Sequence, residues 1–118
     1  MIYNLEERTK EFSKSIVGLI KNTRLNIAIS NICNQLIRSA TSIGANYREA
    51  NNGSSKKDFA NKIYICRKEC EETKYWIELL AEVESERKTL LRNLWQEAQE
   101  LTKIFNTISN SCKSKKFD

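Results

Sequence analysis

The chain has 118 residues, close to the usual size of one domain, and so leaves no room for a large multidomain enzyme. With no proline, three glycines and 40% hydrophobic residues, it suits long uninterrupted helices and excludes a turn-rich β-sandwich, a collagen or a disordered chain. The formal net charge is +5 and there is no histidine, which removes the Ser-His nucleophile pair, the usual proton shuttle and the commonest metal ligand.

The first predicted helix runs from about Leu5 to Lys21. Its apolar seam has alternating gaps of four and three residues, the repeat that keeps one stripe toward a partner helix: Leu5, Thr9, Phe12, Ile16, Leu19. Residues 22–29 are polar but include Leu25, Ile27 and Ile29, so we predict a connection that is pinned to the core.

The second predicted helix begins near Ser30, a plausible N-cap, and ends near Asn51, where two asparagines and Gly53 form a helix stop. Its seam has the same alternating gaps: Ile29, Cys33, Leu36, Ala40, Ile43, Tyr47, Ala50. Gly44 lies inside this helix at a cost on the order of 1 kcal/mol against alanine, which indicates a bend or a close backbone approach.

The third predicted helix follows Ser55 as its N-cap, with Asp58 placed as in a capping box, and reaches about Val83. It carries two apolar lines, which predicts two partners: two neighbours in one bundle, or one neighbour and another subunit. The first line is Phe59, Ile63, Cys66, Cys70, Thr73, Ile77, Leu80, and the second is Ile65, Glu69, Glu72, Trp76, Leu79, Val83.

The fourth predicted helix follows a polar turn at residues 84–86 and spans about Ser85 to Asn110, with the seam Leu91, Leu94, Ala98, Leu101, Phe105, Ile108. Four such helices with short connections predict an all-α fold, an antiparallel up-and-down four-helix bundle over residues 1–112. Residues 113–118 are predicted to be a disordered basic tail.

No stretch resembles a secretory signal, and the apolar runs fall far below the roughly 18 residues that span a bilayer. We therefore expect a cytoplasmic protein without membrane contact. A reducing compartment predicts free thiols for the four cysteines, Cys33, Cys66, Cys70 and Cys112.

Two residue pairs could carry chemistry, and for both a structural role is favoured. Cys66 and Cys70 share one helix face and could supply two zinc ligands, but they lie on the core seam, where cysteine acts as a small hydrophobic residue. Glu69 and Glu72 could act as an acid and a base, but such groups more often pair with arginine, and Arg38, Arg48 and Arg92 are available. We predict no metal, no cofactor and no enzymatic activity.

Charge is distributed unevenly along the chain. Between Lys21 and Lys68 there are nine cations against two anions, whereas residues 69–100 hold nine glutamates against four cations. Because helices two and three are expected to be antiparallel, the cations flanking their turn should form one phosphate-binding patch. The residues predicted to bind nucleic acid are Arg38, Arg48, Lys56, Lys57 and Lys62, and Arg67 and Lys68 lie nearby; the alternative is an ordinary solvated face.

Aromatic residues outside the main seams tend to be buried against another chain, although they can also stack on unpaired bases. On this ground we predict an oligomer interface at Tyr64, Tyr75, Trp76 and Trp95.

Two segments are more specific than helical periodicity requires: QLIRSATSIGANYREA at residues 35–50, and SKKDFANKIYICRKECEETKYWIELL at residues 55–80. They resemble the four-helix bundle family encoded in intervening sequences of bacterial 23S rRNA genes. The matching pieces are QL.R...SI.AN..EA, SKK.F and E..ET.YW.ELL. This chain has Gly44 where the family often carries proline, and Ala50 where it often carries glycine.

The resemblance implies a homopentamer in which five bundles form a barrel. The accessory variability protein of diversity-generating retroelements, which has the same fold, is a basic pentamer that binds nucleic acid and a reverse transcriptase. We therefore predict a non-enzymatic oligomer that binds RNA or DNA with little sequence specificity. The alternative is an adaptor or scaffold for a protein partner such as a reverse transcriptase or a ribosome-associated factor.

Overall fold

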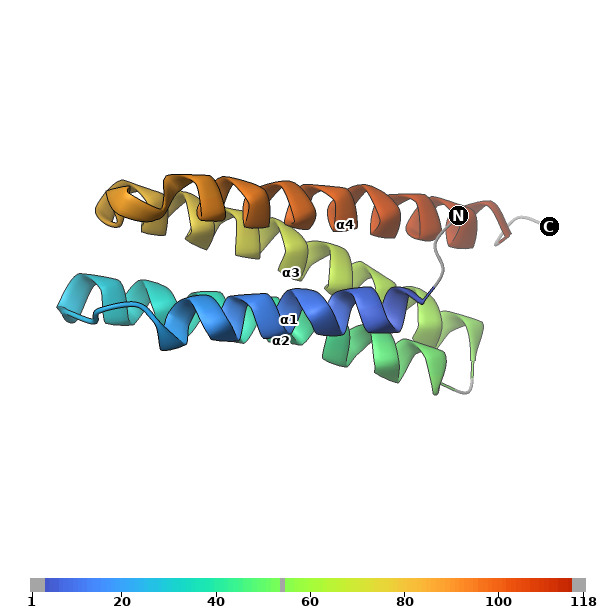
Figure 1. Cartoon of the computed structure of the whole chain (residues 1–118). Coiled ribbons are helices and arrows are strands. Elements are labelled where there is room, and N and C mark those ends of the chain that lie inside the picture. Colours follow the sequence, from blue (N-terminus) through green and yellow to red (C-terminus); the bar gives the residue numbers. More distant parts are fainter. Residues whose placement is uncertain (1–3, 54, 116–118) are drawn as a thin grey trace.

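A computed structural model describes residues 4–53 and 55–115, with the side chains of residues 114 and 115 excepted. It contains the helices α1 (Leu5–Lys21), α2 (Ile27–Asn51), α3 (Lys56–Val83) and α4 (Lys88–Lys115), with a short 3₁₀ helix, η1 (Ser85–Arg87), before α4 (Figure 1). These ranges contain no strand, so the predicted all-α class is confirmed for the described chain.

Helix α1 has the predicted bounds and buries the predicted seam of Leu5, Thr9, Phe12, Ile16 and Leu19. Thr9 is the polar member of that seam. Its hydroxyl donates to the carbonyl oxygen of Leu5 at 2.9 Å within the same helix, so the buried oxygen is satisfied without a partner from another helix.

Helix α2 begins at Ile27, three residues before the predicted start at Ser30. Its N-cap is Asn26, whose side-chain oxygen accepts a hydrogen bond from the backbone N–H of Ile29 at 2.9 Å. The predicted start was wrong because Asn26 is an equally good cap, and the two helical residues that follow it, Ile27 and Ala28, are exposed and precede the apolar seam, which begins at Ile29.

The connection before α2 is held to the bundle, but of the three apolar residues expected to hold it only Ile29 is buried. Leu25 is 56% exposed and Ile27 is 93% exposed. Thr23 is buried instead, and Arg87 donates to its Oγ1 at 2.8 Å and to the carbonyl oxygen of Asn22 at 3.3 Å. Polar contacts therefore fix this turn to η1, just before α4.

Gly44 marks a close approach between α2 and α1. A Cβ atom built on Gly44 would lie 3.2 Å from Oγ1 and 3.4 Å from Cβ of Thr9. The close approach expected from a helical glycine is therefore confirmed. The end of α2 at Asn51 is also the predicted one.

Helix α3 has the predicted end at Val83 and the predicted cap, since the Ser55 hydroxyl oxygen accepts from the backbone N–H of Asp58 at 3.0 Å. Its first apolar line is buried from Ile63 to Leu80. The helix packs against both α2 and α4, so its two partners lie within one chain.

Helix α4 continues to Lys115, beyond the predicted end at Asn110. Residues 113–115 are therefore helical, and the tail does not begin at Lys113 as we predicted; residues 116–118 lie outside the described residues. Leu91, Leu94, Ala98, Leu101 and Phe105 are buried as expected.

Contacts between helices show how the chain folds back on itself. Arg38 of α2 meets Glu69 of α3, whereas Glu49, further along α2, meets Lys62, which is earlier in α3. Helices α2 and α3 therefore run in opposite directions, and Figure 1 shows each helix returning along the one before it. The bundle has extents of 51 × 22 × 21 Å, in keeping with about 42 Å for a 28-residue helix.

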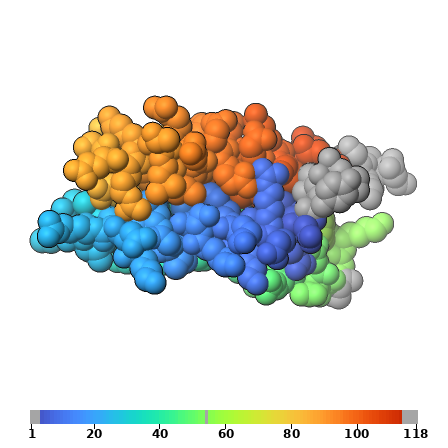
Figure 2. Space-filling view, in the orientation of Figure 1, coloured from blue at the N-terminus to red at the C-terminus, as the bar shows by residue number. Residues whose placement is uncertain are grey.

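Helices α1 and α4 close the bundle. Arg8 donates from Nε and Nη2 to the two carboxylate oxygens of Glu97, at 2.7 and 2.8 Å, which is the two-pronged geometry that suits a guanidinium. Figure 2 shows α1 in blue directly below α4 in orange on this face. No helix in the described ranges is long and apolar enough to cross a membrane.

Candidate nucleic-acid interface

The turn between α2 and α3 brings together four of the five predicted phosphate-binding residues. Arg48 lies in the last turn of α2, and Lys56, Lys57 and Lys62 lie in the first two turns of α3, at the right-hand end of the bundle in Figure 1. Arg38 is more than three helical turns away from Asn51. It therefore belongs to a different part of the surface.

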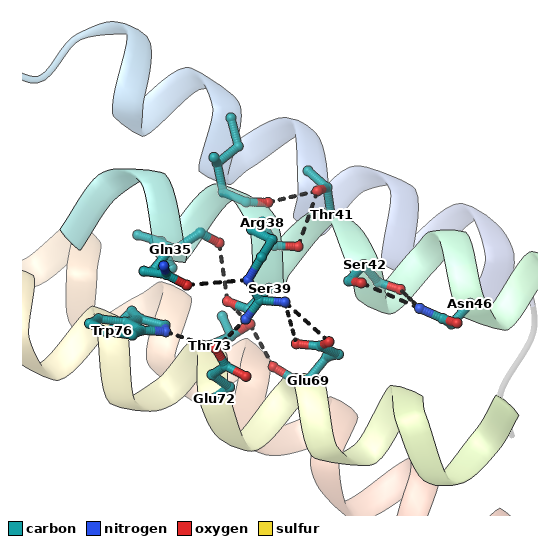
Figure 3. Close-up of polar contacts among 12 residues, drawn as sticks. Gln35, Arg38, Ser39, Thr41, Ser42, Asn46, Glu69, Glu72, Thr73 and Trp76 are labelled. Atoms are coloured by element: carbon teal, nitrogen blue, oxygen red, sulfur yellow. Dashed lines mark hydrogen bonds and ion pairs between the residues drawn. The ribbon is translucent and has the colours of Figure 1, made fainter. Parts of the chain in front are cut away.

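Arg38 lies between two carboxylates of α3 (Figure 3). It donates to both oxygens of Glu69 at 3.3 Å, to Glu72, and to the side-chain oxygen of Gln35 at 3.2 Å. Partial burial opposes its charge, but the hydrogen bonds and charges of the two carboxylates outweigh this and raise the pKa of Arg38. With one cation between two anions, this cluster does not attract phosphate.

The two carboxylates have the structural role predicted for them, and Arg38 is their arginine. Glu72 also accepts a hydrogen bond from the indole N–H of Trp76 at 3.2 Å. Partial burial would raise the pKa of Glu72, but the hydrogen bonds from Trp76 and Arg38 and the arginine charge lower it overall. Beneath the cluster, the hydroxyls of Thr73 and Ser39 lie 3.0 Å apart and join the two helices.

Arg48 and Lys62 line a first groove, between α1, α2 and the start of α3. Arg48 Nε lies 3.8 Å from a carboxylate oxygen of Glu6, and Lys62 Nζ lies 2.7 Å from one of Glu49. The charged residues along this groove are three cations and three anions: Lys10, Arg48, Lys62, Glu6, Glu49 and Asp58. The groove is therefore balanced in charge.

Lys56 and Lys57 line a second groove, which has a different character. Among the described residues that line it, these two lysines are the only charged ones. Both are exposed, and neither forms an ion pair with a residue of the described chain. The apolar residues of the groove come from α2, α3 and the last turns of α4: Ala50, Phe59, Ala60 and Ile108.

The contribution of α4 to this second groove was not predicted from the sequence. Ile108, Ser111 and Cys112 come from the last turns of α4 and lie near the start of α3. The expected antiparallel order of the helices could have indicated this contribution, because it places the end of α4 beside the beginning of α3.

The aromatic residues divide into two pairs. Tyr64 and Tyr75 are each 53% exposed on α3. Trp76 and Trp95 are partly buried against the core, and Trp95 donates its indole N–H to Glu78 at 2.9 Å. The two tyrosines therefore offer more surface to another chain than the two tryptophans do.

Cys33, Cys66 and Cys70 are buried in the core, as the seam predicted, and all four cysteines are free. Cys66 donates its thiol to the carbonyl oxygen of Ile43 at 3.5 Å. Burial raises the pKa of Cys66 to about 12 and that of Cys70 further still. A high thiol pKa keeps the group protonated and disfavours metal ligation.

The fold and this surface define a helical-bundle protein whose distinguishing features are surface charge and exposed tyrosines. The family model for the 23S rRNA-intervening sequence protein matches residues 3–107, and the chain belongs to that family. A solved structure from Bacteroides thetaiotaomicron VPI-5482, a protein with unknown function from the S23 ribosomal protein family, is similar: 33% identity over 88% of this chain and 96% of that chain, with a TM-score of 0.78. A comparison with curated proteins finds no match.

Proposed function

We propose that this chain is a non-enzymatic, self-associating bundle of the cytoplasm that binds RNA or DNA with little sequence specificity. The binding surface is the second groove, and Lys56 and Lys57 make its phosphate contacts. The observation that carries the proposal is that none of the described residues lining the groove beside these two lysines is a carboxylate.

The position of the lysines supports this function. They occupy the first turn of α3, where the unpaired backbone N–H groups and the helix dipole add positive potential. The apolar wall formed by Phe59 and Ile108 offers surface for a sugar or a base edge. Neither feature distinguishes one nucleic-acid base from another, so we expect binding to depend on the phosphate backbone.

The other predicted residues contribute less. Arg48 and Lys62 lie beside the second groove but share their charge with Glu6 and Glu49. They can add to the attraction only where phosphate displaces those carboxylates. Arg38 is excluded from the proposed surface because Glu69 and Glu72 already hold it.

Self-association gives this small patch its strength. Two lysines make few phosphate contacts, but the homopentamer implied by the family resemblance repeats the patch five times. Five copies of a +5 chain carry a formal charge of +25. Several phosphates of one strand are then bound at once, which increases avidity far beyond that of a single subunit.

The proposal is tested by fluorescence anisotropy with a labelled single-stranded RNA and a labelled DNA duplex. We expect binding at about 50 mM salt that weakens steeply as salt rises. The double variant Lys56→Ala, Lys57→Ala should lose about tenfold in affinity or more and show a shallower salt dependence. Lys88→Ala with Arg92→Ala is the matched control, since both are exposed cations at the other end of the bundle.

Unchanged binding by the Lys56, Lys57 variant would refute the assigned surface. If neither nucleic acid binds at micromolar protein, nucleic-acid binding itself is refuted. The adaptor function predicted as the alternative would then take its place. Recovery of a protein partner after nuclease treatment would identify that function.

A further inference from the structure

Two exposed helix faces of the bundle have matching spacing and opposite charge. The first, which we call the α1 face, consists of Lys14, Val17 and Lys21. The second, which we call the α3 face, consists of Glu71, Tyr75 and Glu78. In each face two like charges flank one apolar or aromatic residue over the same length of helix. The two faces are therefore complementary in charge.

The two faces do not meet within one chain. Helices α1 and α3 each pack against α2 and α4, and no contact joins α1 to α3 in the described chain. Figure 1 shows that α1 and α3 run in the same direction. The exposed side of each helix points away from the bundle, so one chain can offer the α1 face to one neighbour and the α3 face to another.

Contacts through α2 set the relative height of α1 and α3 along the bundle. Gly44 of α2 lies against Thr9 of α1. The carbonyl oxygen of the adjacent Ile43 accepts a hydrogen bond from the Cys66 thiol of α3. Thr9 is therefore level with Cys66, and each residue of α1 is level with the α3 residue 57 positions further along the chain.

This offset brings the two faces into register between neighbouring copies of the chain. Rotation about an axis that runs along the bundles turns each copy without shifting it along that axis or reversing its helices. The α1 face of one copy then lies at the height of the α3 face of the next. Val17 lies within one position of the level of Tyr75, and the two charge pairs are Lys14 with Glu71 and Lys21 with Glu78.

We propose that the α1 face is a docking surface for the α3 face of a second copy of this chain, with the two helices parallel. Charge complementarity and the shared height select this occupant and this direction. The contact is head-to-tail, so every copy uses both faces, and a succession of such contacts can close into a five-membered ring. The inference rests on the self-association in the proposed function and identifies the surfaces that mediate it.

The residues of the two faces are available for this contact. Val17 is 44% exposed and Tyr75 is 53% exposed. The Tyr75 ring packs edge-on against Trp76 with ring centroids 4.9 Å apart, and a side chain that is already held in place loses little conformational freedom on docking. Lys21 and Glu78 are exposed, and neither forms an ion pair with a described residue.

The contact ends at Lys14. One turn earlier, Lys10 is level with Arg67, and like charges directly opposite are destabilising. Lys10 lies along the first groove, and the Arg67 guanidinium lies 5.1 Å from the ring centroid of Tyr64 in its own chain. The two helices must therefore diverge toward the start of α1, which limits the contact to about two helical turns.

The test exchanges the charges of one pair. Lys21→Glu and Glu78→Lys should each weaken association about tenfold, and the double variant should return to within about threefold of the wild type. Glu78 also accepts the indole N–H of Trp95, but Glu78→Lys loses that bond with or without Lys21→Glu, so the restoration reports the contact. Association is measured by sedimentation velocity over a range of protein concentrations, without nucleic acid.

The matched control combines Lys21→Glu with Glu71→Lys. It has the same net charge as the first double variant and changes the same two faces, but at different heights. In the proposed register it leaves like charges in both pairs, so association should stay at least tenfold weaker than in the wild type. Net charge alone predicts that both double variants behave like the wild type, and an antiparallel contact predicts restoration by Glu71→Lys.

A neutral substitution tests the centre of the contact. Val17→Asn should weaken association about fivefold, because it removes the apolar surface that meets Tyr75. Leu90→Asn is the matched control, since Leu90 is 42% exposed on α4 and belongs to neither face. It should leave association unchanged.

The inference is overturned if the two double variants behave alike, if only the control combination restores association, if the two asparagine variants behave alike, or if the wild-type chain does not associate. None of these variants changes a residue that lines the second groove. Failure of the charge exchange in a chain that still binds nucleic acid refutes only the contact. A particle in which the exchange restores association but which binds no nucleic acid refutes only the proposed nucleic-acid binding.

Discussion

Gly44 of α2 lies so close to Thr9 of α1 that a Cβ atom on the glycine would be 3.2 Å from the threonine hydroxyl oxygen. Thr9 is fully buried, and its hydroxyl is already bonded to the carbonyl oxygen of Leu5. The side chain can therefore move only by giving up that bond or by pushing the two helices apart.

We expect Gly44→Ala to lower the free energy of unfolding by about 1 kcal/mol. Overpacking costs about 2 kcal/mol here, which exceeds the gain of about 1 kcal/mol in helix propensity. Gly18 is the matched control, because a Cβ there meets nothing within 4 Å. Gly18→Ala should raise the free energy of unfolding by about 0.5–1 kcal/mol. Urea denaturation followed by circular dichroism measures both, and equal changes of the same sign would contradict the close approach.

The cluster around Arg38 predicts a pH dependence of stability. The folded-state pKa of Glu72 is lowered, so its contribution to stability is full above the usual pKa of 4.5 and is lost as pH falls through the folded value. Arg38→Met removes the partner and leaves two neighbouring carboxylates. We expect it to cost about 1 kcal/mol at pH 7, since the pair is partly exposed.

The stabilities of the wild type and Arg38→Met should converge as pH falls below 4.5, because protonation removes the repulsion in the variant and the attraction in the wild type. Thermal melts between pH 3 and pH 7 follow this change. A constant difference across that range would show that Arg38 stabilises the bundle through packing alone.

The observed start of α2 predicts different effects for substitutions of the observed cap, Asn26, and the predicted cap, Ser30. Asn26→Ala removes the oxygen that accepts from the Ile29 N–H and should lower the free energy of unfolding by about 1 kcal/mol. Ser30 lies within the first turns of the helix and is not its cap. Ser30→Ala should therefore change the free energy of unfolding by less than about 0.5 kcal/mol. The reverse order in chemical denaturation would place the helix start at Ser30.

Cysteine reactivity should reflect burial. Cys33, Cys66 and Cys70 are buried with raised thiol pKa values, whereas Cys112 is half-buried in the second groove. A colourless disulfide reagent that releases a coloured thiolate should therefore report one fast thiol in the native protein and four in denaturant. Cys112→Ser should abolish the fast reaction, and a fast thiol that remains in that variant would show that the core opens readily.

Local signals explain how much of the fold was predictable. The seams of α1 and α3 and the cap at Ser55 lie within short stretches of sequence, and these elements were predicted with correct bounds or nearly so. The predicted start of α2 was wrong because Ile27 and Ala28 are exposed and precede the seam, and the predicted end of α4 was wrong because its last turn is polar. The role of Arg87, which holds the connection between α1 and α2, is not indicated by any local pattern in the sequence.

The candidate site was predictable in composition but not in pairing. The sequence indicates where cations gather, and four of the five predicted residues meet at one turn. Which of them a carboxylate offsets depends on how the helices face one another. That relation separates Arg38, which is bonded to Glu69 and Glu72, from Lys56, which forms no ion pair with a described residue.

The pairing of Arg8 with Glu97 spans 89 positions of the chain and has a consequence for synthesis on the ribosome. When α2 and α3 have emerged and can already pair through their short turn, Glu97 is still inside the exit tunnel, and one side of α1 stays uncovered. The bundle is completed only when translation is almost finished, so a nascent chain that stalls before α4 exposes its apolar seam to chaperones and proteases.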